Sequence, residues 1–132
     1  MANANVELAR RIYEAMDTDA EALLELLAPD VEWVNPPDAV VGGTLSGHDG
    51  FAKALIGVAD SFSAWRHEPT RFTEVGDQVL VDLAFHATGR GSGVALEKPE
   101  FHLWSFRDGK ITRLQWFNRR EEALAAAAQA GS

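Results

Sequence analysis

One stretch, Phe101-His-Leu-Trp-Ser-Phe-Arg-Asp-Gly-Lys-Ile-Thr-Arg-Leu-Gln-Trp-Phe-Asn-Arg-Arg-Glu-Glu-Ala-Leu124, decides the fold. Two runs rich in Trp, Phe, Ile and Thr flank Asp108-Gly109, a dipeptide suited to a type I′ turn because both central residues must take φ > 0. The strand face with His102 and Trp104 combines an ionisable group with a large aromatic side chain. This mixture is typical of a ligand pocket rather than of a plain core, so we expect a hairpin with a binding face.

The composition predicts one soluble domain spanning residues 1–132. Hydrophobic residues make up 46% of the chain, charged residues 24%, and there is no cysteine. The net charge is −8, and up to Asp60 there are 11 acids against 3 bases. Nucleic acids and anionic membranes bind clustered Lys and Arg, so neither is expected as a partner. The start of the chain lacks the pattern of a signal peptide, and a cytoplasmic location is expected.

Helical patterns come first and strand patterns follow. Apolar residues recur at helical spacing near residues 6–16, 23–27 and 51–62, and residues 31–35 form a short strand between the second and third helices. Four strands are then predicted at residues 66–75, 78–90, 94–107 and 110–118, with Gly76-Asp77 as the tight turn between the first two. A short helix or a frayed tail is predicted at 121–130. Helices followed by an antiparallel meander indicate an α+β fold.

Side-chain alternation predicts two faces for the strand that starts at Gln78. One face is uniformly apolar and consists of Val79, Val81, Leu83 and Phe85. The other face is mixed and consists of Leu80, Asp82, Ala84 and His86. The apolar stripe is too large to leave in water, and we expect the helices to leave part of it uncovered. A homodimer that pairs through this sheet face is therefore expected.

A catalytic dyad can be hypothesised on the mixed face. If the loop after this strand is centred near Ser92, Asp82 lies directly across from His102, with Cβ atoms about 4.5–5.5 Å apart. A bulge at Pro99 would shift this register. A carboxylate at that range would orient the imidazole and raise the pKa of His102. We therefore assign His102 as general acid or base and Asp82 as its partner.

Two segments and the order of elements resemble the SnoaL-like proteins, small members of the nuclear transport factor 2-like superfamily that also contains ketosteroid isomerases and limonene epoxide hydrolases. The segments are Leu27-Ala-Pro-Asp-Val-Glu-Trp-Val-Asn-Pro36 and Trp104-Ser-Phe-Arg-Asp-Gly-Lys-Ile with Arg119-Arg-Glu-Glu-Ala-Leu124. The resemblance covers essentially the whole chain. It implies a cone-shaped barrel of three N-terminal helices packed on a strongly curved, mostly antiparallel sheet, a fold that hosts both enzymes and binding modules.

Ketosteroid isomerases resemble this chain without sharing their catalytic set. The position of their proton-transferring Asp, which precedes a Pro, holds Asn35, and an amide cannot take the proton. Their oxyanion-hole aspartic acid falls at His102. Their first-helix Tyr falls at Ile12 rather than at Tyr13. The steroid isomerase reaction is therefore not expected.

Limonene epoxide hydrolases and polyketide cyclases offer a second comparison. The water-holding Asn of the hydrolases falls at Asn35 and the neighbouring Tyr at Trp33. Of their Asp-Arg-Asp set, one Asp matches Asp82, whereas the Arg position is Leu80 and the other Asp position is Trp116. Polyketide cyclases of this group use an Asp/His-type acid–base pair, which Asp82 with His102 would imitate.

The candidate binding residues follow from these comparisons. Asn35 would donate a hydrogen bond to a substrate oxygen or water, and its alternative role is that of a turn residue before Pro36. Trp33, Trp104 and Trp116 would form apolar walls, although core packing would explain them equally. His86 would lie at the rim of the cavity.

The remaining histidines are not expected to take part. His48 and His67 are most simply exposed, and no ligand spacing supports a metal site or another cofactor.

Two functions remain open at this point. The first is a small cofactor-free enzyme that performs acid–base chemistry (cyclisation, isomerisation, hydration or hydrolysis) on an apolar, oxygenated small molecule in the cavity. The alternative is a non-catalytic ligand-binding or dimeric accessory domain. Ionisable groups inside an apolar cavity would favour the enzyme, whereas the incomplete catalytic sets favour the alternative.

Overall fold

The elements follow the predicted order of helices and strands. The computed structural model describes residues 3–36 and 43–130 of the chain. The helices are α1 (Asn3–Met16), α2 (Ala20–Glu25), α3 (Gly47–Ser61) and α4 (Arg120–Ala130). The strands are β1 (Leu27–Val34), β2 (Thr44–Ser46), β3 (Phe62–Val75), β4 (Gln78–Gly89), β5 (Ala95–Arg107) and β6 (Lys110–Phe117). The α+β prediction is confirmed.

The strands form one mixed sheet in the order β2-β1-β6-β5-β4-β3. Adjacent strands are antiparallel except for β1 and β6, which are parallel. The sheet is open, with β2 and β3 at its edges, so the expected strongly curved cone is wrong on this point. A physical reason is that β4 and β5 pair from Gln78↔Ser105 to Thr88↔Ala95 without a bulge, and bulges are what bend a sheet sharply; the register shifts of this sheet lie in the β3–β4, β5–β6 and β1–β6 pairs.

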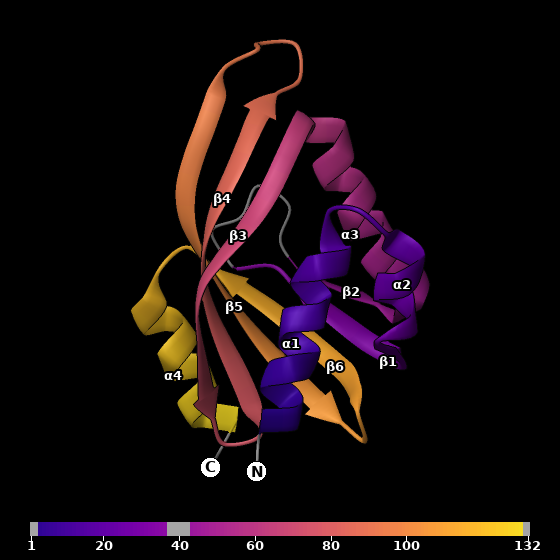
Figure 1. The fold of residues 1–132 in the computed structure, drawn as a ribbon, viewed down its shortest axis with the longest axis vertical. Coiled ribbons are helices and arrows are strands. Elements are labelled where there is room, and N and C mark those ends of the chain that lie inside the picture. Colours follow the sequence, from indigo (N-terminus) through magenta and orange to yellow (C-terminus); the bar gives the residue numbers. More distant parts are fainter. Residues whose placement is uncertain (1–2, 37–42, 131–132) are drawn as a thin grey trace.

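The helices cover both faces of the sheet. Figure 1 shows α1, α2 and α3 on one side and α4 on the other, and we call these the inner and outer faces. The apolar stripe of α1 includes Ala9, Ile12 and Tyr13, which pack on the inner face. On the outer face, Ala123 and Ala127 of α4 pack on two fully buried leucines of β4 and β5. Each face of the sheet therefore has its own apolar core.

The turn chemistry predicted for the last hairpin is confirmed. Asp108 and Gly109 have φ of 52° and 77°, as a type I′ turn requires. Gly76, with φ of 62°, lies in the turn between β3 and β4, also as predicted. Trp65 lies on β3, which begins directly after α3 ends at Ser61.

The apolar stripe of β4 is not a dimer surface. Val79, Val81, Leu83 and Phe85 are at most 4% exposed because they face the inner layer of helices and belong to the core. The expectation that this stripe is left partly uncovered is wrong. The homodimer itself stays a prediction, and a contact surface for it would have to lie elsewhere.

Burial of this stripe can be tested with two identical substitutions. Val81→Ala removes two methyl groups from a fully buried site, and we expect the free energy of unfolding to fall by about 2 kcal/mol. Val94→Ala removes the same atoms from a site that is 64% exposed, so a change within about 0.5 kcal/mol is expected. Urea denaturation of both variants measures the difference. Equal losses would show that the stripe is not core.

Candidate functional site

A row of polar side chains follows one edge of the inner core. Lys98, Glu100, His102 and Trp104 alternate along β5 and therefore point to the same side of the sheet. His102 pairs with Val81 on β4 and with Trp116 on β6, which places it on the inner face. Its side chain is 3% exposed. An ionisable group is thus built into the dry side of the sheet.

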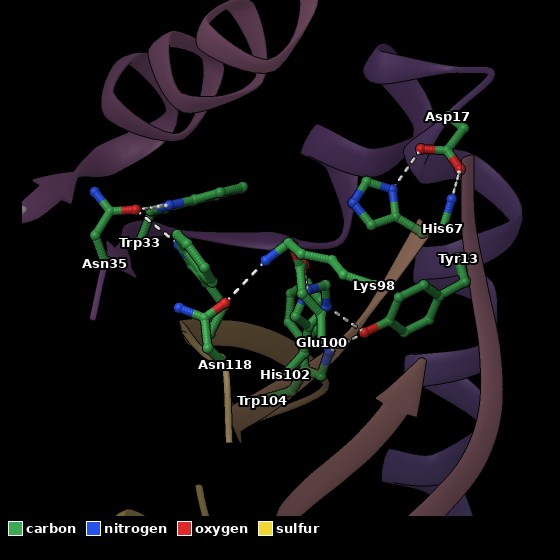
Figure 2. Close-up of polar contacts among 11 residues, drawn as sticks. Tyr13, Asp17, Trp33, Asn35, His67, Lys98, Glu100, His102, Trp104 and Asn118 are labelled. Carbon is green, nitrogen blue, oxygen red and sulfur yellow. Dashed lines mark hydrogen bonds and ion pairs between the residues drawn. The ribbon is translucent and has the colours of Figure 1, made fainter. Parts of the chain in front are cut away.

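Tyr13 joins this row to helix α1. Its hydroxyl oxygen lies 2.6 Å from Nδ1 of His102 and 2.8 Å from Nε1 of Trp104 (Figure 2). The indole N–H can only donate, so the tyrosine oxygen accepts it and the tyrosine O–H is available to donate to Nδ1. A neutral His102 then carries its proton on Nε2 and donates it to Oε1 of Glu100, 3.1 Å away. The bonds run in one direction, from Trp104 through Tyr13 and His102 to Glu100.

The charges in this chain of bonds follow from burial and pairing. Burial raises the pKa of the Tyr13 hydroxyl well above 10, against the lowering effect of the Trp104 hydrogen bond. Burial also lowers the pKa of His102 below 6.5, although Glu100 opposes this. Burial would raise the pKa of Glu100, but the interactions with His102 and with Lys98 outweigh it and lower the pKa to about 2. At neutral pH we therefore expect a neutral tyrosine, a neutral imidazole and an ionised carboxylate.

Lys98 balances the buried carboxylate from the outer end of the row. Its Nζ lies 3.1 Å from Oε2 of Glu100 and donates to Oδ1 of Asn118 at 2.9 Å. It also lies 5.3 Å from the centre of the Trp116 ring, at cation–π range. About one third of the lysine side chain is exposed. The row therefore connects a buried histidine to the surface.

A second histidine faces the same interior from β3. His67 donates from its Nδ1 to Oδ1 of Asp17 at 2.7 Å, and its backbone N–H donates to Oδ2 of the same carboxylate at 2.7 Å. The His67 side chain is 7% exposed, so the expectation that it is exposed is wrong. Asp17 fixes the imidazole with its proton on Nδ1, and the other ring nitrogen points away from Asp17 (Figure 2).

An apolar pocket opens next to this pair. It has a volume of about 350 Å³ and lies between the α1–α2 connection, α3, β1 and β3. Its lining includes Asp17, Trp33, Leu55, Trp65 and His67. The size suits a small organic molecule. His102 does not line the pocket, but the ligand atoms of His67, Glu100 and His102 lie within 4.8 Å of one another, so the polar row lies directly behind His67.

A larger groove of about 750 Å³ lies elsewhere, beside β1 and β6. Its charged lining is already paired: Arg107 with Asp30, and Arg113 with Glu32, at 3.1 and 2.7 Å. These pairs are well exposed and form a solvated surface. We therefore place the candidate site at the smaller pocket, where ionisable groups are buried.

Asn35 connects two of the predicted tryptophans. Its Oδ1 accepts hydrogen bonds from Nε1 of Trp33 at 2.9 Å and from Nε1 of Trp116 at 2.7 Å. These two donors fix the orientation of the amide, with its oxygen toward the indoles. Trp33 lines the pocket, Trp116 lies beside His102 on the sheet, and Trp104 is fully buried behind Tyr13. Four predicted residues thus share one side of the sheet with His102.

Asp82 and His86 are on the wrong side of the sheet for the predicted dyad and rim. Asp82 pairs with Phe101, not with His102, and its Oδ2 accepts from Arg120 of α4 at 3.0 Å. His86 contacts Glu68 and Glu97 on the outer face. The pairing register of β4 and β5 is centred half a residue earlier than Ser92. Because of this difference, Asp82 and His102 lie on opposite faces of the sheet.

Four residues of the site were not predicted, and signals existed for two of them. Counting back from the Gly76 turn places His67 opposite His86 on the outer face, and only the register shift between Pro69 and Arg71 brings it opposite Phe85 on the apolar face. Glu100 is two residues from His102 and must share its face. Tyr13 belongs to the predicted apolar stripe of the first helix, but the resemblance pointed to Ile12 instead. Asp17 follows the helix in a turn, and nothing in the local pattern indicates its contact with His67.

The comparisons with known proteins agree with this architecture. A family model described as a SnoaL-like domain matches residues 9–114. The chain belongs to the SnoaL-like family. No curated protein matched in the corresponding search. No helix among residues 3–36 and 43–130 is long and apolar enough to cross a membrane.

Several solved structures are similar to this chain over nearly their whole length. TerC, crystallised with polyporic acid, is 29% identical with a TM-score of 0.78, covering 95% of this chain and 98% of TerC. An NTF2-like protein of unknown function from Burkholderia pseudomallei is 27% identical with a TM-score of 0.79, at 92% and 95% coverage. A protein with a ketosteroid isomerase-like fold from Catenulispora acidiphila, in complex with trimethylamine, is 20% identical with a TM-score of 0.75, at 92% and 92% coverage. The last of these supports the fold alone.

The protonation of His102 can be measured directly. Glu100→Gln removes the carboxylate that raises the pKa of His102 while burial continues to lower it, so we expect the pKa to fall further. Histidine side-chain NMR between pH 4 and 8, in a buffer with a chelator, measures both the pKa and the protonated nitrogen. Glu97→Gln removes the same charge from an exposed position of β5 and should change little. An unchanged or higher pKa in Glu100→Gln would contradict the assignment.

Tyr13 offers an independent test because the chain contains one tyrosine. Its pKa is raised well above 10, so the folded protein should show no tyrosinate absorbance during an alkaline titration until it unfolds. Circular dichroism recorded in parallel identifies the pH of unfolding. Ionisation near pH 10 in a folded protein would mean that the hydroxyl is not held in the core.

Proposed function

We propose that this protein is an enzyme that performs acid–base chemistry on an apolar, oxygenated small molecule held in the pocket beside His67. The observation that carries the proposal is the Asp17–His67 pair, joined at 2.7 Å at the edge of an apolar pocket of about 350 Å³. A histidine oriented by a carboxylate is suited to taking a proton from a bound molecule and returning it. Isomerisation, cyclisation and hydration or hydrolysis all need such a step.

The roles in this proposal follow from position. His67 exchanges the proton through Nε2, since Nδ1 is held by Asp17. Asp17 keeps the ring oriented by accepting from both Nδ1 and the backbone N–H of His67. His102 and Glu100 lie behind His67 and polarise the interior, with Tyr13 as the neutral donor to His102. Trp33 and Trp65 provide the apolar walls that exclude water from a bound ligand.

The similarity to TerC supports a small organic ligand. TerC was crystallised with polyporic acid, and it shares 29% identity with this chain over almost all of both. An organic acid has polar oxygen groups, which His67 can contact, and an apolar carbon skeleton, which matches the apolar lining of the pocket. We propose the same broad class of ligand here. The cytoplasmic location and the homodimer expected from the sequence remain predictions beside it.

One observation favours the alternative, a ligand-binding domain without catalysis. The polar groups behind His67 have partners within the protein: the oxygen of Tyr13 accepts from Trp104, and Oδ1 of Asn35 accepts from two indoles. Polar networks satisfied in this way also serve to rigidify a core. Binding without conversion of the ligand is the result that this alternative predicts.

Polyporic acid is the first probe for both proposals. Its binding should quench the fluorescence of Trp33 and Trp65, and its conversion should change its absorption spectrum. We expect His67→Gln to bind the probe but to convert it about 100-fold or more slowly, because a general acid–base group contributes about 10²–10⁴-fold. His86→Gln, on the outer face, is the matched control and should behave as wild type.

The possible results separate the two functions. Conversion by wild type and by His86→Gln but not by His67→Gln supports the enzyme. Binding that leaves the spectrum of polyporic acid and of a panel of similar-sized apolar acids unchanged supports the binding domain. Conversion that is unaffected in His67→Gln would contradict the role given to this residue.

A further inference from the structure

Three potential metal ligands converge at the inner end of the pocket. They are His67 on β3 and Glu100 and His102 on β5, and their ligand atoms lie within 4.8 Å of one another. The shortest of these separations recorded is 3.1 Å, between Nε2 of His102 and Oε1 of Glu100. All three side chains are largely buried. Unlike an acidic surface patch, this group combines two nitrogens and one carboxylate oxygen in the interior.

The second nitrogen of each imidazole already has an oxygen partner. Nδ1 of His67 is 2.7 Å from Asp17, and Nδ1 of His102 is 2.6 Å from the Tyr13 hydroxyl. Metal-binding histidines almost always donate their other ring N–H to such an oxygen, which orients the ring and directs the remaining lone pair at the ion. The Tyr13 oxygen has a second lone pair for this N–H beside the one used by Trp104. His67 therefore presents Nε2 to an ion. His102 does so once its proton moves from Nε2, where it donates to Glu100 in the metal-free protein, to Nδ1, with the Tyr13 O–H turned away from that nitrogen.

The charge of the group suits a divalent ion. Glu100 supplies one negative charge, and the two histidines bind as neutral ligands. Asp17 supplies a second carboxylate behind His67, so a divalent ion would be close to neutralised. The positive charge of Lys98 would repel the ion. However, Lys98 contacts Oε2 of Glu100 rather than Oε1, and its side chain is one third exposed, so it can turn toward solvent.

We propose that His67, Glu100 and His102 form a three-ligand site for a divalent transition-metal ion, with Zn²⁺ as the best fit. Two imidazoles and one carboxylate favour Zn²⁺ and its neighbours over Mg²⁺ and Ca²⁺, which prefer oxygen ligands. Bonds of about 2.0–2.2 Å place tetrahedral ligand atoms about 3.4 Å apart, so His67 must move inward by roughly an ångström. Since His67 also lines the pocket, the fourth position of the ion would face the pocket.

This inference does not rest on the proposed function. It concerns the ion alone, and it is tested without any organic ligand. The two proposals share one atom, because Nε2 of His67 cannot hold an ion and exchange a proton at the same time. Zn²⁺ is therefore expected to inhibit proton transfer by His67, while a failure to bind Zn²⁺ would leave the acid–base proposal untouched.

The test is a titration of the full chain with ZnCl₂ after treatment with a chelator and exchange into metal-free buffer. Isothermal titration calorimetry should show one ion per chain. Co²⁺ as a second probe should give the intense visible bands of a four-coordinate nitrogen and oxygen site. Glu100→Gln and His67→Gln should each weaken Zn²⁺ binding by about 100-fold or more, whereas Asp17→Asn, which keeps all three ligands, should weaken it by about 10–100-fold.

The matched control is the histidine on the outer face. His86 contacts Glu68 at 2.8 Å and Glu97 at 3.2 Å, so it is the competing His/Glu group among the described residues. His86→Gln should leave the affinity for Zn²⁺ unchanged. Circular dichroism verifies that each variant is folded, and Asp17→Asn together with the Co²⁺ spectrum of the wild type decides the question if His67→Gln does not fold.

Two results would overturn the proposal. The first is the absence of Zn²⁺ binding by the wild-type protein at micromolar concentration. The second is Zn²⁺ binding that survives in Glu100→Gln and His67→Gln, or that is lost in His86→Gln, because the ion would then be held elsewhere.

Discussion

The buried hydroxyl of Tyr13 is the interaction on which the inner half of the molecule depends. It accepts from Trp104 and donates to His102, so three polar groups that cannot reach water satisfy one another. Leaving any one of them unpaired in the core would cost about 1–3 kcal/mol. Only one rotation of helix α1 about its axis and one position along the sheet satisfy all three groups. The apolar contacts of its stripe alone would allow several.

The position of α1 in turn determines the electrostatics of the site. The helix ends at Met16, and the carboxylate that follows it, Asp17, meets His67 on the edge strand. On the other side of the same core, Glu100 stays ionised because Lys98 and His102 outweigh its burial. Two carboxylates thus approach the interior from opposite directions, each paired with a histidine. The pocket opens beside the first of these pairs, Asp17 and His67, and the second pair lies behind it.

The fold was largely predictable, because turn chemistry and periodicity are local. The Asp108-Gly109 turn, the hairpin at Gly76 and the helical stripe of α1 all depend on a few neighbouring residues. The prediction that His102 and Trp104 share one face of their strand was also correct, since alternation along one strand is a local property. What failed was the register between β4 and β5, because it depends on the conformation of residues 89–94, which lie between the last pair, Thr88↔Ala95. A difference of half a residue in its centre exchanges Asp82 for Val81 as the partner of His102.

The pairing of β1 with β6 has a consequence for the synthesis of the chain. Strand β1 lies near the start of the sequence, but its parallel neighbour β6 lies near the end, and Asn35 and Trp116 are separated by 81 positions. Long-range pairings of this kind slow folding, because a large loop must close before any contact forms. During translation, α1, α2 and β1 emerge long before β6 exists. The edge of β1 that pairs with β6 therefore stays unpaired in the nascent chain until β6 is made, and an unpaired strand edge is prone to aggregation.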